Sequence, residues 1–206
     1  MRIALLMEAT TAEKNEVVAN ALNEIAANTG HTIDNYGQYS KDGFQVTTIT
    51  NSILGSALIE CGAADFIVTG CGTGMGNNMC LDAMPNLVSG VASTPYEMAI
   101  LLQNVNVNCV AMAYSKGYGW AGEINVYDVM DVLLKYLSNP SMDSPEVEKL
   151  KSIKKAASKD IATIIREADP ALIKQAFGGP NTMKYLDKNC TDGGRLSKII
   201  HEIIDK

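Results

Sequence analysis

The sequence lacks several features that would each assign it to a familiar class of protein. No apolar run approaches the roughly 20 residues of a membrane-spanning helix, and the apolar start is followed at once by Glu8, without a signal-peptide cleavage pattern. No stripe of basic residues is present, and the net charge of −6 argues against a nucleic-acid partner. We therefore expect a cytoplasmic protein that binds neither membranes nor nucleic acids.

The cysteines form no C-x-x-C pair. The sequence contains five of them, at Cys61, Cys71, Cys80, Cys109 and Cys190. An odd and scattered set is typical of free thiols in a reducing compartment rather than of a disulfide framework or a zinc site. We therefore expect five free thiols, with Cys80 and Cys109 in the core, and no bound metal.

Short apolar runs alternate with segments of helical periodicity along the first two thirds of the chain. Strands are expected at residues 3–7, 31–37, 65–70, 87–93 and 108–115, and helices at 12–27, 49–59, 95–102 and 123–137. Strand–helix repeats of this length indicate parallel strands joined by right-handed crossovers. The expected fold class is therefore α/β: a three-layer α/β/α sandwich with a Rossmann-like parallel sheet, which binds ligands beyond the carboxyl ends of its strands.

The composition changes near residues 138–145, beyond which charged helical stretches dominate. We expect an α/β domain at 1–137 and a helical C-terminal extension at 138–206. Lysine and glutamate in such helices usually form a solvated face. The extension is expected to build an oligomer or to form a lid over the site.

A glycine-rich loop follows the expected strand at 65–70, in the stretch FIVTGCGTGMGNN (66–78). Glycine occupies every second position, at Gly70, Gly72, Gly74 and Gly76. Such a loop lets the backbone approach a ligand closely, and its N–H groups favour anions. It matches neither the dinucleotide fingerprint nor the P-loop, because the last glycine of the first motif and the G-K-[ST] of the second are missing. The loop therefore predicts a site for a small anion other than a nucleotide.

Cys71 lies within this loop, and Thr73 adds a hydroxyl beside the backbone N–H groups from Gly72 to Asn77. Positive potential in such a loop favours the thiolate. A thiolate beside an oxyanion hole suits nucleophilic attack or removal of a proton from a carbon next to a carbonyl. Hydrolysis by a thiol is disfavoured, because no histidine lies near the loop in the sequence. The alternative is that Cys71 is a small buried residue at the end of a strand.

The loop and several later motifs resemble those of one enzyme family. The C-G-T-G-x-G signature of the type B ribose-5-phosphate isomerases and of the two galactose-6-phosphate isomerase subunits is matched at 71–76. The similarity continues through S-x-P-Y at 93–96 and N-C-V-A at 108–111, with weaker matches at the apolar start and at G-G-R, 193–195. The chain thus resembles a divergent member of this family with a C-terminal helical extension.

The resemblance implies a cofactor-independent aldose–ketose isomerase that acts on a small sugar phosphate through a cis-enediolate, without a metal. Cys71 would move the proton between C1 and C2, and its loop with Thr73 would hold the enediolate oxygens. The resemblance also implies a homodimer or homotetramer with sites at the subunit interfaces. By position, the substrate-binding residues would be Gly72, Gly74, Met75, Gly76, Asn77, Asn78, Tyr96, Lys116 and Arg195.

The chain departs from the family at its acid–base residues. The early Asp-His pair falls on Glu8-Ala9 and the ring-opening histidine on Asn104, while His31 and His201 stand at no catalytic position. Asparagine cannot open a sugar ring by proton transfer. Three explanations remain: a substrate without a ring, transfer of the role to Glu8, or an inactive or partner-dependent subunit. The catalytic candidates are Cys71, Thr73, Glu8 and Asn104.

Cations for a substrate phosphate are also few, since the chain has three arginines. Arg2 is expected to be a surface charge and Arg166 a solvated residue. Arg195 stands where a phosphate-binding arginine of the family follows Gly-Gly, and Lys116 stands next to the position of another. We expect poor turnover of ribose 5-phosphate and favour a short or permanently open-chain phosphorylated ketose. The alternative function is a non-catalytic or partner-dependent subunit that binds a sugar phosphate.

Other residues near the loop are open to two interpretations. Asn77 and Asn78 are expected to cap the helix after the loop, which does not exclude contact with a ligand. Tyr96, Tyr118 and Trp120 follow the ends of expected strands, where aromatic rings wall a pocket or pack in an interface.

Overall fold

The computed structural model describes residues 1–139 and 145–206. Five parallel strands form one sheet in the order β2-β1-β3-β5-β4. The strands are β1 (Arg2–Leu6), β2 (Thr32–Gly37), β3 (Phe66–Cys71), β4 (Ser89–Ala92) and β5 (Cys109–Ala113). Each predicted strand is therefore confirmed, as is the parallel α/β sheet.

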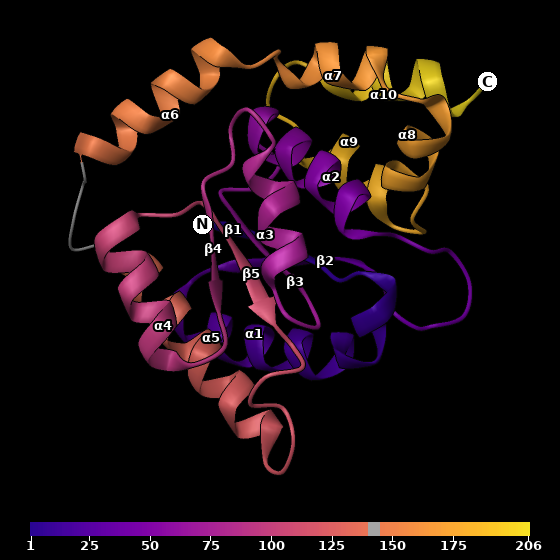
Figure 1. The fold of residues 1–206 in the computed structure, drawn as a ribbon. Coiled ribbons are helices and arrows are strands. Elements are labelled where there is room, and N and C mark those ends of the chain that lie inside the picture. Colours follow the sequence, from indigo (N-terminus) through magenta and orange to yellow (C-terminus); the bar gives the residue numbers. More distant parts are fainter. Residues whose placement is uncertain (140–144) are drawn as a thin grey trace.

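Helices cover both faces of the sheet (Figure 1). One face carries α1 (Asn15–Thr29), α4 (Pro95–Ile100) and α5 (Gly122–Ser138), and the other carries α2 (Thr48–Glu60) and α3 (Met75–Asp82). Side chains alternate along β1, so that Ile3 and Leu5 enter one hydrophobic cluster while Ala4 and Leu6 enter the other. The predicted three-layer sandwich is confirmed.

Two of the predicted helices differ from the structure at an end. Residues Ala9–Lys14 form a 3-10 helix, η1, so that α1 begins at Asn15 rather than at residue 12. Beyond α4 the chain continues as a π-helical segment, η2 (Leu101–Val105), before it enters β5. Both irregular segments lie where a strand and a helix are joined.

The C-terminal segment adds helices outside the sandwich. They are α6 (Pro145–Ala157), α7 (Ile161–Glu167), α8 (Pro170–Phe177), α9 (Thr182–Asn189) and α10 (Arg195–Ile204). α7 and α8 pack on α2 and share its hydrophobic cluster, with Ile165, Ile173 and Phe177 fully buried (Figure 1). The expected change at 138–145 falls mostly outside the described residues, and the division into 1–137 and 138–206 stays a prediction.

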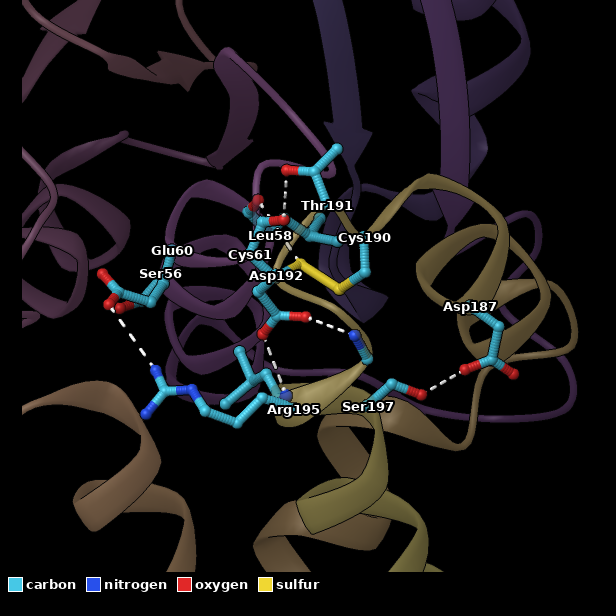
Figure 2. Close-up of a disulfide and its surroundings, with 12 residues drawn as sticks. Ser56, Leu58, Glu60, Cys61, Asp187, Cys190, Thr191, Asp192, Arg195 and Ser197 are labelled. Atoms are coloured by element: carbon cyan, nitrogen blue, oxygen red, sulfur yellow. Dashed lines mark hydrogen bonds and ion pairs between the residues drawn. A yellow bond between two sulfur atoms is a disulfide. The ribbon is translucent and has the colours of Figure 1, made fainter.

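A disulfide between Cys61 and Cys190 joins this C-terminal segment to the end of α2 (Figure 2). The prediction of five free thiols is therefore wrong for these two cysteines, while Cys71, Cys80 and Cys109 are free. The two residues are separated by 129 positions, and the packing of the C-terminal helices brings their Cα atoms within 5.1 Å. Beside the disulfide, the backbone N–H and the hydroxyl of Thr191 donate to the Cys61 carbonyl at 2.7 and 3.1 Å.

His201 in α10 lies between two carboxylates, Asp187 at 3.2 Å and Asp205 at 3.3 Å. The hydrogen bond with Asp187, together with the negative charges, raises the pKa of His201 above its ordinary value of 6.5. A raised pKa stabilises the fold below pH 6.5, and this stabilisation is lost as the pH rises through the raised value.

We expect the substitution Asp187→Asn to lower the pKa of His201 toward its ordinary value, because the first and largest of these interactions is weakened. The measurement is an NMR titration of the histidine ring protons, in which the distant His31 provides a reference signal. An identical titration of His201 in the two proteins would show that Asp187 is not the main cause of the raised pKa.

Candidate active site

The carboxyl ends of β1, β3 and β5 bring three side chains together. In the strand register Leu6 lies opposite Thr69, and Cys71 lies opposite Ala113. Extending the first register by two residues places Glu8 beside Cys71, and η1, which Glu8 caps, contacts β3. Ser115 follows the end of β5 and its backbone N–H donates to the Gly72 carbonyl at 2.8 Å. Cys71 is half-buried at the centre of this group.

The alternating glycines of the loop are explained by close contact with β5. A Cβ atom at Gly70 would lie 2.3 Å from the Met112 carbonyl oxygen. Gly74 has a φ of +75°, and a Cβ atom there would lie 2.8 Å from the Ala111 carbonyl oxygen. No side chain fits at these two positions. At Gly76, by contrast, a Cβ atom would meet nothing within 4 Å, so the loop is open on that side.

The backbone at the start of α3 offers hydrogen-bond donors beside Cys71. The Met75 N–H donates to the Thr73 hydroxyl oxygen at 3.3 Å, which leaves the Thr73 O–H able to donate elsewhere. The N–H groups of Gly76 and Asn77 donate to no group in the described part of the chain. Unpaired N–H groups at a helix start bind anions. The predicted anion loop therefore has free donors next to the thiol.

Asn77 and Asn78 hold the loop from inside α3. The amide of the buried Asn77 donates to the Thr69 hydroxyl at 3.2 Å and to the Gly70 carbonyl at 3.3 Å. The side-chain amide oxygen of Asn78 accepts the Ser89 hydroxyl at 2.9 Å. The prediction that these residues cap the helix is wrong, because Gly74, in a left-handed conformation, occupies the capping position.

Glu8 is buried, with 3% of its surface exposed, and its carboxylate is held locally. It accepts the Thr10 N–H at 3.0 Å and also the Thr10 hydroxyl. The Thr11 hydroxyl lies 3.5 Å from the same carboxylate. These contacts hold the carboxylate at the start of η1, the segment that contacts β3.

Tyr96 and Lys116, both predicted to bind substrate, lie at the same edge of the sheet. Tyr96 is 74% exposed in the first turn of α4, after β4, and Lys116 is exposed after the end of β5. Of the aromatic residues near them, Tyr118 packs edge-on against Tyr114, with 5.5 Å between ring centroids, while Trp120 is fully exposed. Tyr118 is therefore partly buried against the core, and it also lines a small pocket with Lys14 and Val17 of the first helices.

Two predicted site residues lie away from this edge. Asn104 is exposed in η2, ahead of the start of β5. Arg195 begins α10, and its guanidinium lies 4.0 Å from the Glu60 carboxylate at the end of α2, ahead of β3 (Figure 2). Both residues are thus near the amino ends of the strands, so neither can reach Cys71 of its own chain.

The remaining arginines and the histidines also lie away from this edge. Arg2 at the start of β1, predicted to be a surface charge, is partly exposed and forms an ion pair with the mostly buried Asp34 at 2.9 Å. Arg166 is exposed in α7, as predicted. His31 contacts the N-terminal amine and the Leu134 carbonyl. The carboxyl edge of the sheet therefore has no arginine or histidine from the described residues of this chain.

Two serines at this edge, Ser115 and Ser93, were not among the predicted site residues, although Ser93 begins the S-x-P-Y motif. Ser115 lies so close to the loop that a Cβ atom on Gly72 would be 3.0 Å from its hydroxyl oxygen. Ser93, after β4, donates its N–H and hydroxyl to Glu97 at 2.7 and 2.6 Å, and these bonds lower the pKa of the Glu97 carboxyl. Each serine directly follows an apolar strand, and this position could have indicated that it lies near the site. Because serine is common at strand ends, the position alone does not predict a functional residue.

The described helices include none that is long and apolar enough to cross a membrane. Within residues 1–139 and 145–206, no group of three or more histidine, cysteine, aspartate or glutamate side chains is arranged to hold a metal ion.

Comparison with known proteins identifies two structures that match almost the whole chain. A 4-deoxy-L-threo-5-hexosulose-uronate ketol-isomerase, crystallised with a tartrate, is 26% identical, with a TM-score of 0.91 over 100% of both chains. A ribose-5-phosphate isomerase from Vibrio parahaemolyticus is 30% identical, with a TM-score of 0.90 over 98% of this chain and 99% of its own. The fold of a ribose 5-phosphate isomerase from Thermotoga maritima is also similar, with 17% identity and a TM-score of 0.59 over 76% of this chain and 98% of its own.

No curated protein sequence matches the chain significantly. The sequence model of the ribose/galactose isomerases, however, matches residues 3–152. This match includes the five strands except for Arg2, the first residue of β1, and it includes the glycine loop and both serines at the carboxyl edge. The chain therefore belongs to the ribose/galactose isomerase family and is an aldose–ketose isomerase.

Proposed function

We propose that this isomerase moves a proton between C1 and C2 of a small open-chain sugar anion, with the Cys71 thiolate as the base. The thiolate takes a proton from one carbon, the electron pair forms the C1–C2 double bond of a cis-enediolate, and the thiol returns the proton to the other carbon. The observation that carries this proposal is the half-buried Cys71 beside the unpaired N–H groups of Gly76 and Asn77. No organic cofactor is needed, since no electron leaves the substrate.

The loop supplies the charge stabilisation for this step. The free N–H groups of Gly76 and Asn77 and the Thr73 hydroxyl would donate to the enediolate oxygens, which carry more negative charge than the substrate carbonyl. Gly74, Met75 and Gly76 contribute backbone only, and Asn78 and Tyr96 flank the substrate. Glu8, fixed beside Cys71, is our candidate for moving the proton between the O1 and O2 hydroxyls.

The absence of ring-opening groups sets the form of the substrate. Asn104 lies far from Cys71, and no histidine of the described chain lies at the carboxyl edge. We therefore propose a substrate that enters already open, and poor turnover of ribose 5-phosphate. In a homodimer or homotetramer, Asn104 and Arg195 would face the site of another copy. They could then contact the substrate bound there, although they cannot reach Cys71 of their own chain.

Two anions are candidates for the substrate. A phosphorylated ketose agrees with the family, and Lys116 directly follows Ser115, whose N–H donates to the loop at the Gly72 carbonyl. A sugar acid is favoured by one specific observation, namely that all three arginines lie away from the carboxyl edge. A carboxylate has a single charge and needs fewer cations than a phosphate. The similar ketol-isomerase carries a uronate in its name and was crystallised with a dicarboxylate.

The test is hydrogen exchange in D₂O. The protein is incubated with ketose and aldose phosphates of four, five and six carbons and with an open-chain keto-uronate, and deuterium at C1 and C2 is followed by NMR. We expect exchange with at least one open-chain anion and slow exchange with ribose 5-phosphate. Exchange of ribose 5-phosphate at a kcat/KM of about 10⁴ M⁻¹s⁻¹ or more would contradict the open-chain proposal. No exchange with any compound would favour a partner-dependent or binding subunit.

A further inference from the structure

A cavity of about 500 Å³ lies near the amino ends of the strands, at the edge of the sheet opposite to Cys71. The sandwich contributes Glu60 at the end of α2, Asn86 in the loop between α3 and β4, and Asn108 directly before β5. The other walls come from α6 and the start of α7, which lie beyond the amino ends of the strands (Figure 1). The lining includes no residue of the glycine loop, so this cavity is separate from the candidate active site.

α6 directs lysines rather than apolar side chains toward this cavity. Lys151 and Lys155 line it, and the side chain of Lys154 between them is only 18% exposed. By contrast, Leu150 and Ile153 of the same helix are 49% and 65% exposed. A surface helix usually buries its apolar residues and exposes its lysines. The reversed orientation of α6 therefore brings positive charge to the space between this helix and the sheet.

Lys154 fixes this orientation of α6. Its ammonium group donates to the Leu87 carbonyl, directly ahead of β4, and lies 3.8 Å from the carboxylate of Asp82 at the end of α3. The positive charge of Lys154 is therefore compensated by the sandwich. Lys151 lies one turn before this contact and Lys155 directly after it, so both are held at the cavity.

The polar groups on the sandwich side of the cavity are already bonded to one another. The Asn108 side chain accepts the Val88 N–H at 2.8 Å and donates to the Asn86 carbonyl at 2.8 Å. The Asn86 side chain accepts the Ser56 hydroxyl at 2.6 Å and donates to the Ser56 carbonyl at 2.9 Å. This wall is therefore formed in advance, and its side chains do not compensate the lysines opposite.

The two carboxylates of the lining also have partners of their own. Glu60 lies 4.0 Å from the Arg195 guanidinium of α10 (Figure 2). Asp160 accepts the N–H of Thr163 at 2.9 Å and its hydroxyl at 3.2 Å, and so caps α7. Because each negative charge is engaged in this way, neither is placed to neutralise the lysines of α6.

The two lysines of the lining, in contrast, remain available to a ligand. Lys151 pairs with Glu148 at 2.8 Å, but the Glu148 side chain is mostly exposed, and such surface ion pairs are weak. Lys155 forms no ion pair with any residue that the structure describes. The cavity therefore has positive charge on one wall that the protein itself does not compensate.

We propose that this cavity is a second ligand site, which binds a small organic anion through Lys151 and Lys155. Its volume is within the range of about 300–1,000 Å³ for small-molecule sites. Ile59, Pro85 and Ile161 supply apolar surface for the carbon body of the ligand. Ammonium groups bind carboxylates and phosphates alike, so the ligand class is an organic anion with either group. The site does not depend on the proposed proton transfer.

Three compounds with the same six-carbon chain test the site: gluconate carries a carboxylate, sorbitol 6-phosphate carries a phosphate, and sorbitol carries no charge. Each is titrated into protein with ¹³C-labelled isoleucine methyl groups and followed by NMR. Ile59 and Ile161 of the lining are the reporters, and Ile25 of α1, on the other face of the sheet, is the reference. We expect the signals of Ile59 and Ile161 to shift with at least one anion and not with sorbitol.

Two substitutions change the cavity in different ways. Lys155→Glu reverses a charge of the lining, and its matched control is Lys184→Glu, on an exposed position of α9. Ser158→Phe fills the space, and its control is Ser152→Phe, on an exposed position of α6. We expect each cavity variant to weaken the affinity for the anion at least tenfold and each control less than twofold. Thermal unfolding confirms that all four variants are folded.

The outcomes are independent of the chemistry at Cys71. An equal shift with sorbitol, no shift at Ile59 and Ile161 with either anion, or unchanged affinity in Lys155→Glu or Ser158→Phe would each overturn the site. An equal loss in Lys184→Glu would overturn it too, because it would show attraction to the overall charge of the chain. Binding that follows the expected pattern supports the site even where no hydrogen exchange is observed, and the tighter anion identifies the group that the lysines hold.

Discussion

Replacing Cys71 with alanine is expected to lower the exchange of substrate hydrogen by about 10⁴-fold, at the upper end of what a general base contributes. Alanine has no group that can accept the proton, and the other ionisable side chain placed beside β3, Glu8, is already held by Thr10. Affinity should change little, because the N–H groups of Gly76 and Asn77 and the Thr73 hydroxyl remain in place. The measurement is deuterium incorporation by NMR, with calorimetry for binding.

The matched control for this substitution is Cys80→Ala. Cys80 is also a free, half-buried cysteine, but it lies within α3, with its sulfur 3.8 Å from the Thr48 hydroxyl. We expect its loss to leave exchange unchanged. Activity that survives Cys71→Ala and disappears in Glu8→Gln would assign the base to Glu8 and refute the cysteine mechanism.

Removing the Cys61–Cys190 disulfide is expected to reduce the free energy of unfolding by about 5 kcal/mol, because it closes a loop with a sequence separation of 129 residues. That is a large part of the 5–15 kcal/mol typical of a folded domain. The effect should be strongest around the disulfide. There Asp192 accepts the N–H groups of Gly194 and Leu196, both at 2.9 Å, and so begins α10 beside the end of α2 (Figure 2).

Urea denaturation of the double variant Cys61→Ala/Cys190→Ala measures this loss, with and without dithiothreitol. The reductant should lower the stability of the wild type and leave the variant unchanged, because the variant has no disulfide to reduce. Cys80→Ala is again the control. A change of less than about 1 kcal/mol, far below the loop-closure expectation, would show that α2 and the C-terminal helices are held by packing alone.

The burial of α2 explains why the chain needs its C-terminal helices. In α2 all nine residues from Thr50 to Leu58 are buried, so this helix is covered on both sides. The sheet covers one side, while α7 and α8 cover the other. The two structures that match nearly the full chain share this extent, whereas the shorter isomerase from Thermotoga maritima matches 76% of it. The extension therefore completes the core as well as forming part of the cavity wall.

The sequence by itself determined the sheet, the carboxyl-edge position of the glycine loop and the place of Cys71 within it. These features depend on residues close together in the chain. Apolar runs indicate buried strands, and alternate glycines mark a backbone that passes close to its neighbour, as Gly70 and Gly74 do along β5. The family signature at 71–76 lies within this same stretch. It could be recognised from the sequence because its residues are also close together in the chain.

Only the tertiary structure decided which distant residues meet. It placed Asn104 and Arg195 at the amino ends of the strands, engaged Arg2 with Asp34, and brought Cys61 to Cys190. It also placed a turn of the C-terminal segment beside the loop that follows β2. Such contacts depend on how helices pack across many residues of intervening chain, and periodicity carries no information about that. The sequence thus determined where the proposed chemistry lies, and the tertiary packing determined which distant residues lie near one another.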